Sequence, residues 1–562
     1  MDDLRKTQMS FARKALAEPQ HQFEDLYHLI CRKDWVETAL DAVLNNSGSK
    51  TAGIDGISRK DFEREGFRNQ FIEQLRNDLK RETIQPTPVR RTWIPKSSGG
   101  QRPLGIPTIR DRVVQMLLKM LMEPIWESDF LDCSNGFRPG RRTWDSVALC
   151  YDRIHKQNKF YWVIEGDIKG CFDHINHSIL LKLIRRRIAD RRIVNLIDQL
   201  LRAGVFEAGL FQHTPEGTPQ GGIVSPLLAN IYLHEFDLWW WKHYGNIGLL
   251  ARQKRRRQHL GNCLLTRYAD DFILLCNGSK EEVLKLREEV REFLWNQLHL
   301  ELSLEKTHVT HATEGFNFLG YHVQLRFPSD NDPWLHITPS EKSVQRLRDK
   351  VNQMTTSRTL FDMPEQKLKA INRVIRGWAN YYRNVSFIKT ANKLDWWVND
   401  RFFLWLKKKH RVGARRIMEM YKVREVRKNG SRWTLGMKDQ HGEMVYLYQM
   451  ADAPRITYHP PKRTNPYLGE EPLPLPITDE PFPAFWTGAS NPEYEEREIA
   501  KRQALERDGY RCVRCGSQEK VQVHHILALS DGGTHELANL ETLCERCHVT
   551  TPSYGRKRDS TG

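Results

Sequence analysis

Long apolar runs are absent from the sequence. None of its 562 residues lies in a stretch of the roughly 20 consecutive apolar residues that a membrane-spanning helix needs. The N-terminal segment Met1–Lys6 is polar and is not followed by the apolar core of a signal peptide. We therefore expect a soluble, cytoplasmic protein of a bacterial-type cytosol, with no membrane among its partners.

Cysteines are too few and too unevenly placed for a disulfide framework. Of the ten, six are scattered over the first 276 residues and four form two Cys-x-x-Cys pairs near the C-terminus. The pairs are Cys512 with Cys515 and Cys544 with Cys547, separated by 28 residues. Four thiolates in this arrangement are typical of a closed tetrahedral zinc site in a reducing compartment. We predict that they bind a structural Zn²⁺.

Acidic residues are outnumbered. The 87 Lys and Arg exceed the 70 Asp and Glu, which gives a formal net charge of +17, and the excess is clustered in runs such as 254–257 and 407–411. Residues 401–430 hold eleven Lys or Arg against two acidic residues. The alternative is that these runs are only solvent-exposed surface, which explains a single basic run better than several. The clusters favour a polyanionic partner, nucleic acid, bound through phosphates and weakened by salt.

The length excludes a single hydrophobic core and indicates three or four domains. Residues 458–492 contain nine prolines. Such a stretch favours an extended linker between domains, because proline disfavours both helix and sheet.

Two adjacent carboxylates, Asp270 and Asp271, stand between apolar segments. Leu264-Leu265 precedes them and residues 273–276 follow, so the pattern predicts two buried strands joined by a tight turn. Two anions beside apolar strands are costly unless a cation neutralises them, and a divalent metal is the usual one. Asp-Asp pairs are also common in plain polar turns. This motif alone leaves both interpretations open.

Three other segments carry candidate site residues. The buried strand predicted over 160–164 runs on to Asp167, and Phe172 follows five residues later, although a strand-end Asp is often only a cap. A glycine turn between two short strands predicts a hairpin that brings Lys96 near Arg102. This pair of cations suits the binding of a triphosphate, and a plain surface role for both residues is the alternative. Gln220 precedes Gly221-Gly222. Two glycines allow the backbone to approach a ligand closely, and a purely structural turn needs the same residues.

The order of these motifs over about 300 residues resembles that of a reverse transcriptase. The matching positions, in chain order, are Lys96 with Arg102, Gly136-Phe137-Arg138-Pro139-Gly140, Asp167 with Phe172, Gln220-Gly221-Gly222, Tyr268-Ala269-Asp270-Asp271 and Phe318-Leu319-Gly320-Tyr321. The upstream loop ending at Ile54-Asp55-Gly56 is similar to that of reverse transcriptases encoded within group II introns. Six motifs in order are far more specific than a single Ala-Asp-Asp.

The resemblance implies a right-hand polymerase with fingers and palm on residues 1–325. Such enzymes use two Mg²⁺ ions, roughly 3.5 to 4 Å apart, for in-line phosphoryl transfer. Asp167 and Asp270 are the implied main ligands, and Asp271 the implied support of the metal at the primer 3′ end. The implied roles at the dNTP are triphosphate binding by Lys96 and Arg102, sugar packing and 2′-hydroxyl exclusion by Phe172, and lining of the nucleotide pocket by Gln220.

Helical periodicity runs through residues 340–411. Three amphipathic helices in succession predict a small bundle. The segment Gly377-Trp378-Ala379-Asn380-Tyr381-Tyr382 is similar to the thumb, or maturase, region of group II intron proteins. The resemblance implies a thumb over 326–411 that binds intron RNA and a basic DNA-binding region over 412–457.

The C-terminal pattern resembles an HNH endonuclease, with a zinc-stabilised ββα-metal fold. His524 and His525 lie between the cysteine pairs, Asn539 follows, and His548 stands directly after Cys547. The resemblance implies that His525 is the general base, His524 and His548 bind Mg²⁺ or another divalent metal, and Asn539 orients the loop that carries the base. Family members often have an acidic residue in place of His524, which leaves the metal open. The alternative is a zinc ribbon that only binds DNA.

The sequence thus predicts a multidomain α+β protein of the group II intron-encoded kind, with the HNH domain on residues 493–562. It would copy intron RNA at a nicked DNA target, assist splicing as a maturase, and cut the target strand that becomes the primer. The expected partners are intron RNA, target DNA and dNTPs. One alternative is a splicing-only maturase with vestigial enzymatic centres. A domesticated or defence-associated reverse transcriptase would be expected to lack the HNH domain or the thumb.

Overall fold

The computed structural model describes residues 2–95, 101–155, 158–203, 205–207, 210–212, 222–245, 249–258, 260–327, 333–427, 430–456, 465–469, 500, 503–518, 521–527, 534 and 536–551. The chain divides into two compact units. The first comprises Met1–Gly245 and Leu250–Leu473, and the second comprises Asn246–Leu249 and Pro474–Gly562.

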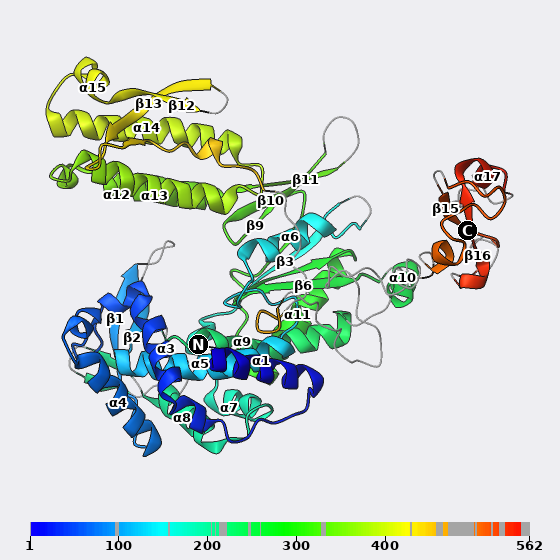
Figure 1. The fold of residues 1–562 in the computed structure, drawn as a ribbon, viewed down its shortest axis with the longest axis horizontal. Helices are drawn as coiled ribbons and strands as arrows, with labels where there is room; N and C mark the ends of the chain where they lie inside the picture. The colour runs from blue at the N-terminus through cyan, green and yellow to red at the C-terminus, as the bar shows by residue number, and fades with distance from the viewer. Residues whose placement is uncertain are drawn as a thin grey trace. The chain divides into compact units, whose positions relative to one another are not determined.

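The N-terminal part of the first unit combines helices with a small sheet (Figure 1). Its helices are α1 (Asp2–Ala17), α2 (Tyr27–Ile30), α3 (Lys33–Asn45) and α4 (Phe67–Lys80), with short 3-10 helices at Ser47–Lys50 and Arg59–Glu63. The sheet has the order β2-β1-β4-β5 and consists of β1 (Val89–Pro95), β2 (Gln101–Ile106), β4 (Val205–Glu207) and β5 (Leu210–Gln212). The predicted hairpin is confirmed: β1 and β2 pair antiparallel with Ile94 opposite Arg102.

Helix α5 (Ile109–Asp129) is the central helix of this unit and is buried along most of its length. It begins where the Thr108 hydroxyl accepts a hydrogen bond from the Asp111 amide, which satisfies a free N–H of the first turn. On its sides it packs against α1, α3 and α9 (Ser225–Trp240). Its buried residues include charged side chains such as Asp111, Arg112 and Glu127 as well as apolar ones.

A four-stranded sheet of order β6-β7-β3-β8 follows. The strands are β3 (Trp162–Asp167), β6 (Cys263–Tyr268), β7 (Asp271–Cys276) and β8 (His308–His311), and the helices of this region are α6 (Thr143–Arg153), α7 (His177–Arg185), α8 (Arg191–Arg202), α9, α10 (Leu249–Arg257) and α11 (Lys280–Leu298). The apolar runs of β6 and β7 are buried, as their composition predicts. Helix α11 begins at a capping box formed by Ser279 and Glu282.

Beyond this sheet lies a three-stranded sheet, β11-β10-β9, made of β9 (Phe316–Phe318), β10 (Tyr321–Arg326) and β11 (Trp334–Pro339). The predicted three-helix bundle is confirmed as α12 (Glu341–Met354), α13 (Pro364–Tyr382) and α14 (Ile388–His410), with a 3-10 turn at Ser357–Thr359. These helices run side by side in Figure 1. Helix α15 (Ala414–Tyr421) and the sheet of β12 (Lys422–Arg427), β13 (Gly430–Lys438) and β14 (Met444–Tyr446) complete this part.

A short segment within the proline-rich stretch, residues 465–469, packs on α5. Asn465 is fully buried, and its side-chain amide donates to Ser128 Oγ at 2.9 Å. The Tyr467 hydroxyl donates to Glu123 Oε2 at 2.7 Å. Burial raises the pKa of Glu123. The stretch predicted as a linker therefore contains an attachment point to the first unit.

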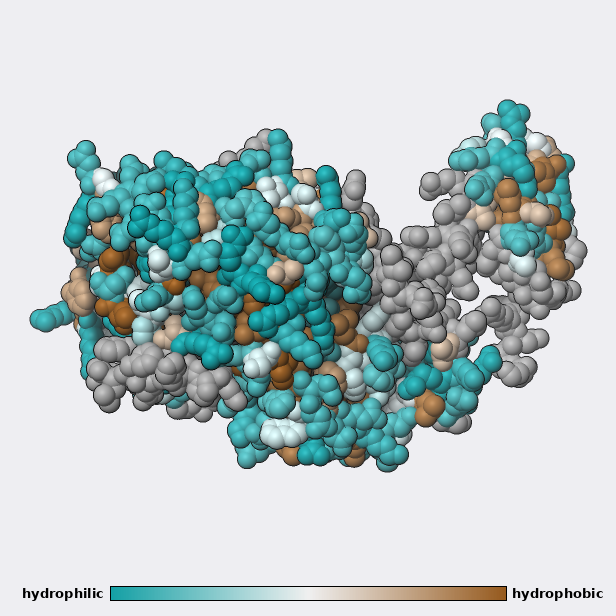
Figure 2. Space-filling model, turned by 90° about the horizontal axis from the view of Figure 1, so that it is seen from below, coloured by the Kyte–Doolittle hydropathy of each residue, from teal (hydrophilic) through white to brown (hydrophobic). Residues whose placement is uncertain are grey.

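The described part of the second unit is small. It contains β15 (Val521–His525) paired antiparallel with β16 (Leu540–Cys544), a 3-10 turn at Leu537–Asn539 and α17 (Glu545–Val549). Among the described residues of the whole chain, no helix is both long and apolar enough to cross a membrane. Figure 2 shows one face of the molecule, on which hydrophilic residues predominate and apolar residues are scattered in the hollows.

Candidate functional site

The three carboxylates predicted to bind metal converge at one end of the β6-β7-β3-β8 sheet. Strands β3 and β7 pair antiparallel in a register that sets Asp167 directly opposite Asp271. Asp270 precedes Asp271 in the turn between β6 and β7, where Ala269 has a φ of +59°. Residues directly opposite on antiparallel strands have Cβ atoms about 5 Å apart. The side chains of Asp167 and Asp271, far apart in the sequence, are thus close enough to share a metal site.

Arg267 connects this turn to neighbouring elements through its guanidinium. Its guanidinium is fully buried and forms an ion pair with Asp237 of α9, at 2.5 and 2.9 Å. It also donates to Ala269 O at 2.9 Å, Ser134 Oγ at 2.8 Å and Asn230 Oδ1 at 3.1 Å. Although burial alone would raise the pKa of Asp237, the guanidinium holds it below its usual value. Neither Arg267 nor Asp237 is predicted from the sequence to have a role.

The loop before α6 fits tightly against the same turn. A Cβ added to Gly136 would lie only 2.1 Å from the backbone nitrogen of Ala269, so only glycine fits there. Phe137 follows with a φ of +58° and packs edge-on to Phe172, with ring centroids 6.4 Å apart. The ring centroid of Tyr268 lies at the same distance from that of Phe137. Phe172 therefore lies near the carboxylates, in the 3-10 turn Cys171–Asp173 that follows β3.

A cleft of about 1480 Å³ opens beside the carboxylates. Asp167 and Asp271 line it on one side, and α12 and α13 line it on the other. From α12 it receives Lys342, Arg346 and Lys350, which are four residues apart and so share one face of the helix. This arrangement places a row of cations across a cleft from a group of carboxylates.

Three further contacts are formed by residues of this cleft. Lys306, for which no role is predicted from the sequence, forms an ion pair with Asp167 at 3.1 Å. The hydroxyls of Tyr381 and Tyr382 in α13 donate to the carbonyls of Leu319 and Gly320, at 2.8 and 3.0 Å. The turn of the Phe318-Leu319-Gly320-Tyr321 motif is thus held by the predicted thumb segment.

Three predicted nucleotide contacts cannot be placed. Lys96 and Gln220 lie outside the described residues, and of Arg102 only the backbone, in β2, is described. Their assignment to dNTP binding stays a prediction.

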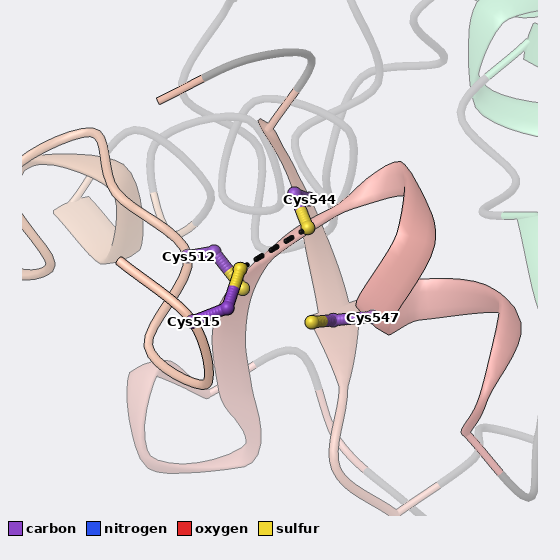
Figure 3. A group of neighbouring side chains, drawn as sticks. All are labelled: Cys512, Cys515, Cys544 and Cys547. Carbon is purple, nitrogen blue, oxygen red and sulfur yellow. Dashed lines mark hydrogen bonds between the residues drawn. The ribbon is translucent and has the colours of Figure 1, made fainter. Parts of the chain in front are cut away.

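In the second unit the four cysteines come together as predicted. The Sγ atoms of Cys512, Cys515, Cys544 and Cys547 all lie within 4.8 Å of one another and point inward from a loop, a strand end and a helix (Figure 3). Tetrahedral zinc with Zn–S bonds of about 2.3 Å requires sulfurs about 3.8 Å apart. Burial raises the pKa of Cys512, but backbone N–H donors outweigh it and lower the pKa to about 6. The cluster is consistent with zinc.

Removing the metal should affect this unit alone. We expect one zinc per chain by mass spectrometry, and Cys544→Ser should abolish it, because a structural site needs all four ligands. Hydrogen exchange should then rise throughout 503–551 and stay unchanged in α5. The matched control is Cys150→Ala, which replaces a buried cysteine of the first unit. This variant should still contain one zinc per chain. Full zinc retention in Cys544→Ser would refute the site.

The predicted nuclease residues lie beside this cluster. His524 and His525 are in β15, His548 is in α17, and the rings of His524 and His548 are in contact, with centroids 4.9 Å apart. Burial, and then the neighbouring His548, lower the pKa of His524. Two histidine rings in contact can supply two ligands to a divalent metal. His525 is partly buried at the end of the same strand.

Asn539 forms hydrogen bonds with the backbone that follows His525. Its side-chain oxygen accepts from the Leu527 amide at 2.9 Å, and its side-chain nitrogen donates to Leu527 O at 3.1 Å and Thr534 O at 2.8 Å. Its own carbonyl accepts from the Ile526 amide at 2.9 Å. These hydrogen bonds hold the backbone of Ile526 and Leu527, directly after β15, against Asn539.

Comparison with known families matches these regions one by one. Residues 94–323 match the family described as reverse transcriptase (RNA-dependent DNA polymerase), so the first unit contains a reverse transcriptase domain. Residues 344–424 match the maturase-specific domain of group II introns, and residues 512–551 match the HNH endonuclease family. The chain belongs to the group II intron-encoded proteins that have reverse transcriptase, maturase and HNH domains. Such domains imply a divalent metal and binding of intron RNA.

Individual relatives agree with this assignment. The chain is 37% identical over 333 residues to Protein YkfC of Escherichia coli (strain K12), an alignment that covers 56% of this chain and 87% of that protein. It is 35% identical over 354 residues to the group II intron-encoded protein LtrA of Lactococcus lactis subsp. cremoris. That alignment covers 54% of this chain and 57% of LtrA, so the chain spans little more than half of that relative.

Proposed function

We propose that the protein copies intron RNA into DNA, using Asp167, Asp270 and Asp271 as the metal-binding carboxylates. The observation that carries this proposal is the pairing of Asp167 with Asp271 at the edge of the cleft. Two Mg²⁺ ions bound there would stabilise the attacking and leaving oxygens of nucleotide addition. The cations of α12 would contact the phosphates of a primer–template duplex, and Phe172 would pack under the sugar of the dNTP; the lining of the cleft and the contact of Phe172 with Phe137 support these roles.

The second unit is proposed to cut the DNA strand that serves as primer. His525 would take the proton from the attacking water as general base. His524 and His548 would hold the catalytic divalent metal, and Asn539 keeps the end of β15 in place. The zinc-bound cysteines would stabilise a ββα-metal fold around them. The maturase-specific domain would bind the intron RNA and assist its splicing.

This proposal divides the chain as the motifs suggest. Fingers and palm occupy residues 1–325, the thumb 326–411, a DNA-binding region 412–457, a linker 458–492 and the HNH domain 493–562. The supporting features are the bundle of α12–α14 and the separate compact unit that contains the HNH match. The proposed location is the cytosol of a bacterium, in complex with RNA and DNA.

A target-primed assay tests the coupling of cutting and copying. We expect His525→Ala to nick an intact DNA target about a hundredfold or more slowly, because a general base contributes about 10²- to 10⁴-fold. The same variant, bound to intron RNA, should synthesise cDNA normally on a target that has been nicked in advance. Nick formation and cDNA length are both read on sequencing gels.

Three outcomes decide between the alternatives. Wild-type nicking by His525→Ala would remove His525 from the mechanism. Failure of that variant on the nicked target would mean that the histidine supports the fold and not the cut. A wild-type protein that assists splicing but neither nicks nor copies would favour the alternative of a maturase with vestigial centres.

A further inference from the structure

Helix α14 has a largely exposed face that does not line the cleft beside the carboxylates. We call it the α14 outer face; it comprises Lys389, Lys393, Trp396, Asp400, Leu404 and Lys407. The spacing of three or four residues places these side chains on one stripe of the helix. With 1.5 Å per residue, the stripe is about 27 Å long.

Trp396 is the most unusual residue of this face. Its side chain is 74% exposed, whereas the opposite side of α14 is buried through residues such as Leu394, Phe402 and Trp405. The neighbouring Trp397 is engaged by Arg348, whose guanidinium carbon lies 5.9 Å from the ring centroid. Packing therefore explains the fold of α14 without Trp396. An exposed tryptophan on such a helix is typical of a binding surface.

The charge of the α14 outer face is positive. It carries three lysines against one aspartate, and Lys389, Lys393 and Lys407 form no ion pair with any described acidic side chain. Lys389 and Lys393 lie within one to two turns of Trp396. Cations that flank an exposed aromatic ring suit a nucleic acid, whose phosphates contact the lysines while a base stacks on the ring.

This face is separate from the polymerase cleft. The residues of the helical bundle that line the cleft come from α12 and α13, and no residue of α14 is among them. The match to the maturase-specific domain, in contrast, extends over the whole of α14. A ligand on the α14 outer face therefore need not be the primer–template duplex.

We propose that the α14 outer face binds an unpaired segment of the intron RNA, with one base stacked on Trp396 and phosphates on Lys389, Lys393 and Lys407. Stacking on a side chain requires a base that is free of its neighbours, which loops and bulges of a folded RNA provide and duplex DNA does not. The inference rests on the proposed maturase role and adds to it the binding surface and the kind of RNA element recognised.

The test compares full-length variants in binding to a transcript of the surrounding intron. Trp396→Ala should weaken binding about tenfold to a hundredfold, since stacking of one base on an aromatic side chain accounts for a factor of this size. Trp396→Phe should retain most of the affinity. Trp295→Ala removes another exposed tryptophan, 61% exposed and on α11, and should bind like wild type. Affinity is measured by filter binding, and contact sites by ultraviolet crosslinking to the peptide 389–407.

Other readouts separate this proposal from the wider function. Trp396→Ala should extend oligo(dT) on poly(rA) at the wild-type rate and should keep its affinity for a duplex DNA target. Equal RNA affinity of Trp396→Ala and wild type would overturn the proposal and leave the proposed function intact. Loss of duplex DNA binding, or a change in oligomeric state by light scattering, would also overturn it. If the wild-type protein does not bind the intron transcript, the maturase function itself fails.

Discussion

Asp270→Asn should lower the rate of cDNA synthesis at least about a thousandfold, which corresponds to roughly 4 kcal/mol of transition-state stabilisation. Asparagine keeps the size of the side chain but removes the negative charge that binds the metal. The turn itself should persist, because Arg267 holds it through the backbone carbonyl of Ala269, at 2.9 Å. The measurement is single-turnover extension of a DNA primer on an RNA template.

The control for this variant is Glu301→Gln, which removes a carboxylate from an exposed ion pair with Lys169 and should leave the rate unchanged. Binding of intron RNA and nicking of the DNA target should be normal in both variants, because neither depends on the polymerase carboxylates. Wild-type synthesis by Asp270→Asn would show that the carboxylates opposite each other on β3 and β7 are not the metal site.

Local sequence patterns predicted individual elements well. The apolar runs on both sides of Asp270 and Asp271 predicted β6 and β7 because a buried strand needs continuous apolar residues. The pairing of Asp167 with Asp271 could not be predicted from such patterns, because the register between strands far apart in the chain depends on the whole fold. It was expected only from the resemblance to reverse transcriptases.

The ion pair of Arg267 with Asp237, which supports the turn between β6 and β7, is not among the predictions, although the sequence contains a signal for it. Arg267 interrupts an apolar strand and Asp237 interrupts an apolar helix, and an isolated charge in a buried element requires a partner. Which charge pairs with which is not encoded locally. Strand β12 could not be predicted in this way, because its two valines, Val423 and Val426, are three residues apart and its other residues are all charged.

Arg267→Ala should destabilise the first unit by about 3 to 5 kcal/mol, because it leaves the Asp237 carboxylate buried without its partner. It should also abolish cDNA synthesis, since Ala269, Ser134 and Asn230 lose a common hydrogen-bond donor. Tryptophan fluorescence in urea reports this unfolding, as all but one of the 16 tryptophans precede residue 474. The surface variant Arg202→Ala, which loses an exposed pair with Asp198, should cost less than about 1 kcal/mol.

The double variant Arg267→Met, Asp237→Leu distinguishes stability from positioning. Replacing both charges of a buried pair by apolar side chains of similar size often restores most of the stability. The carbonyl of Ala269 nevertheless stays without its donor, so the turn that carries Asp270 and Asp271 is no longer fixed relative to Asp167. We therefore expect a protein that unfolds near the wild-type urea concentration and still fails to extend a primer. Recovery of both properties would mean that Arg267 contributes only to folding and that β-sheet pairing alone positions the carboxylates.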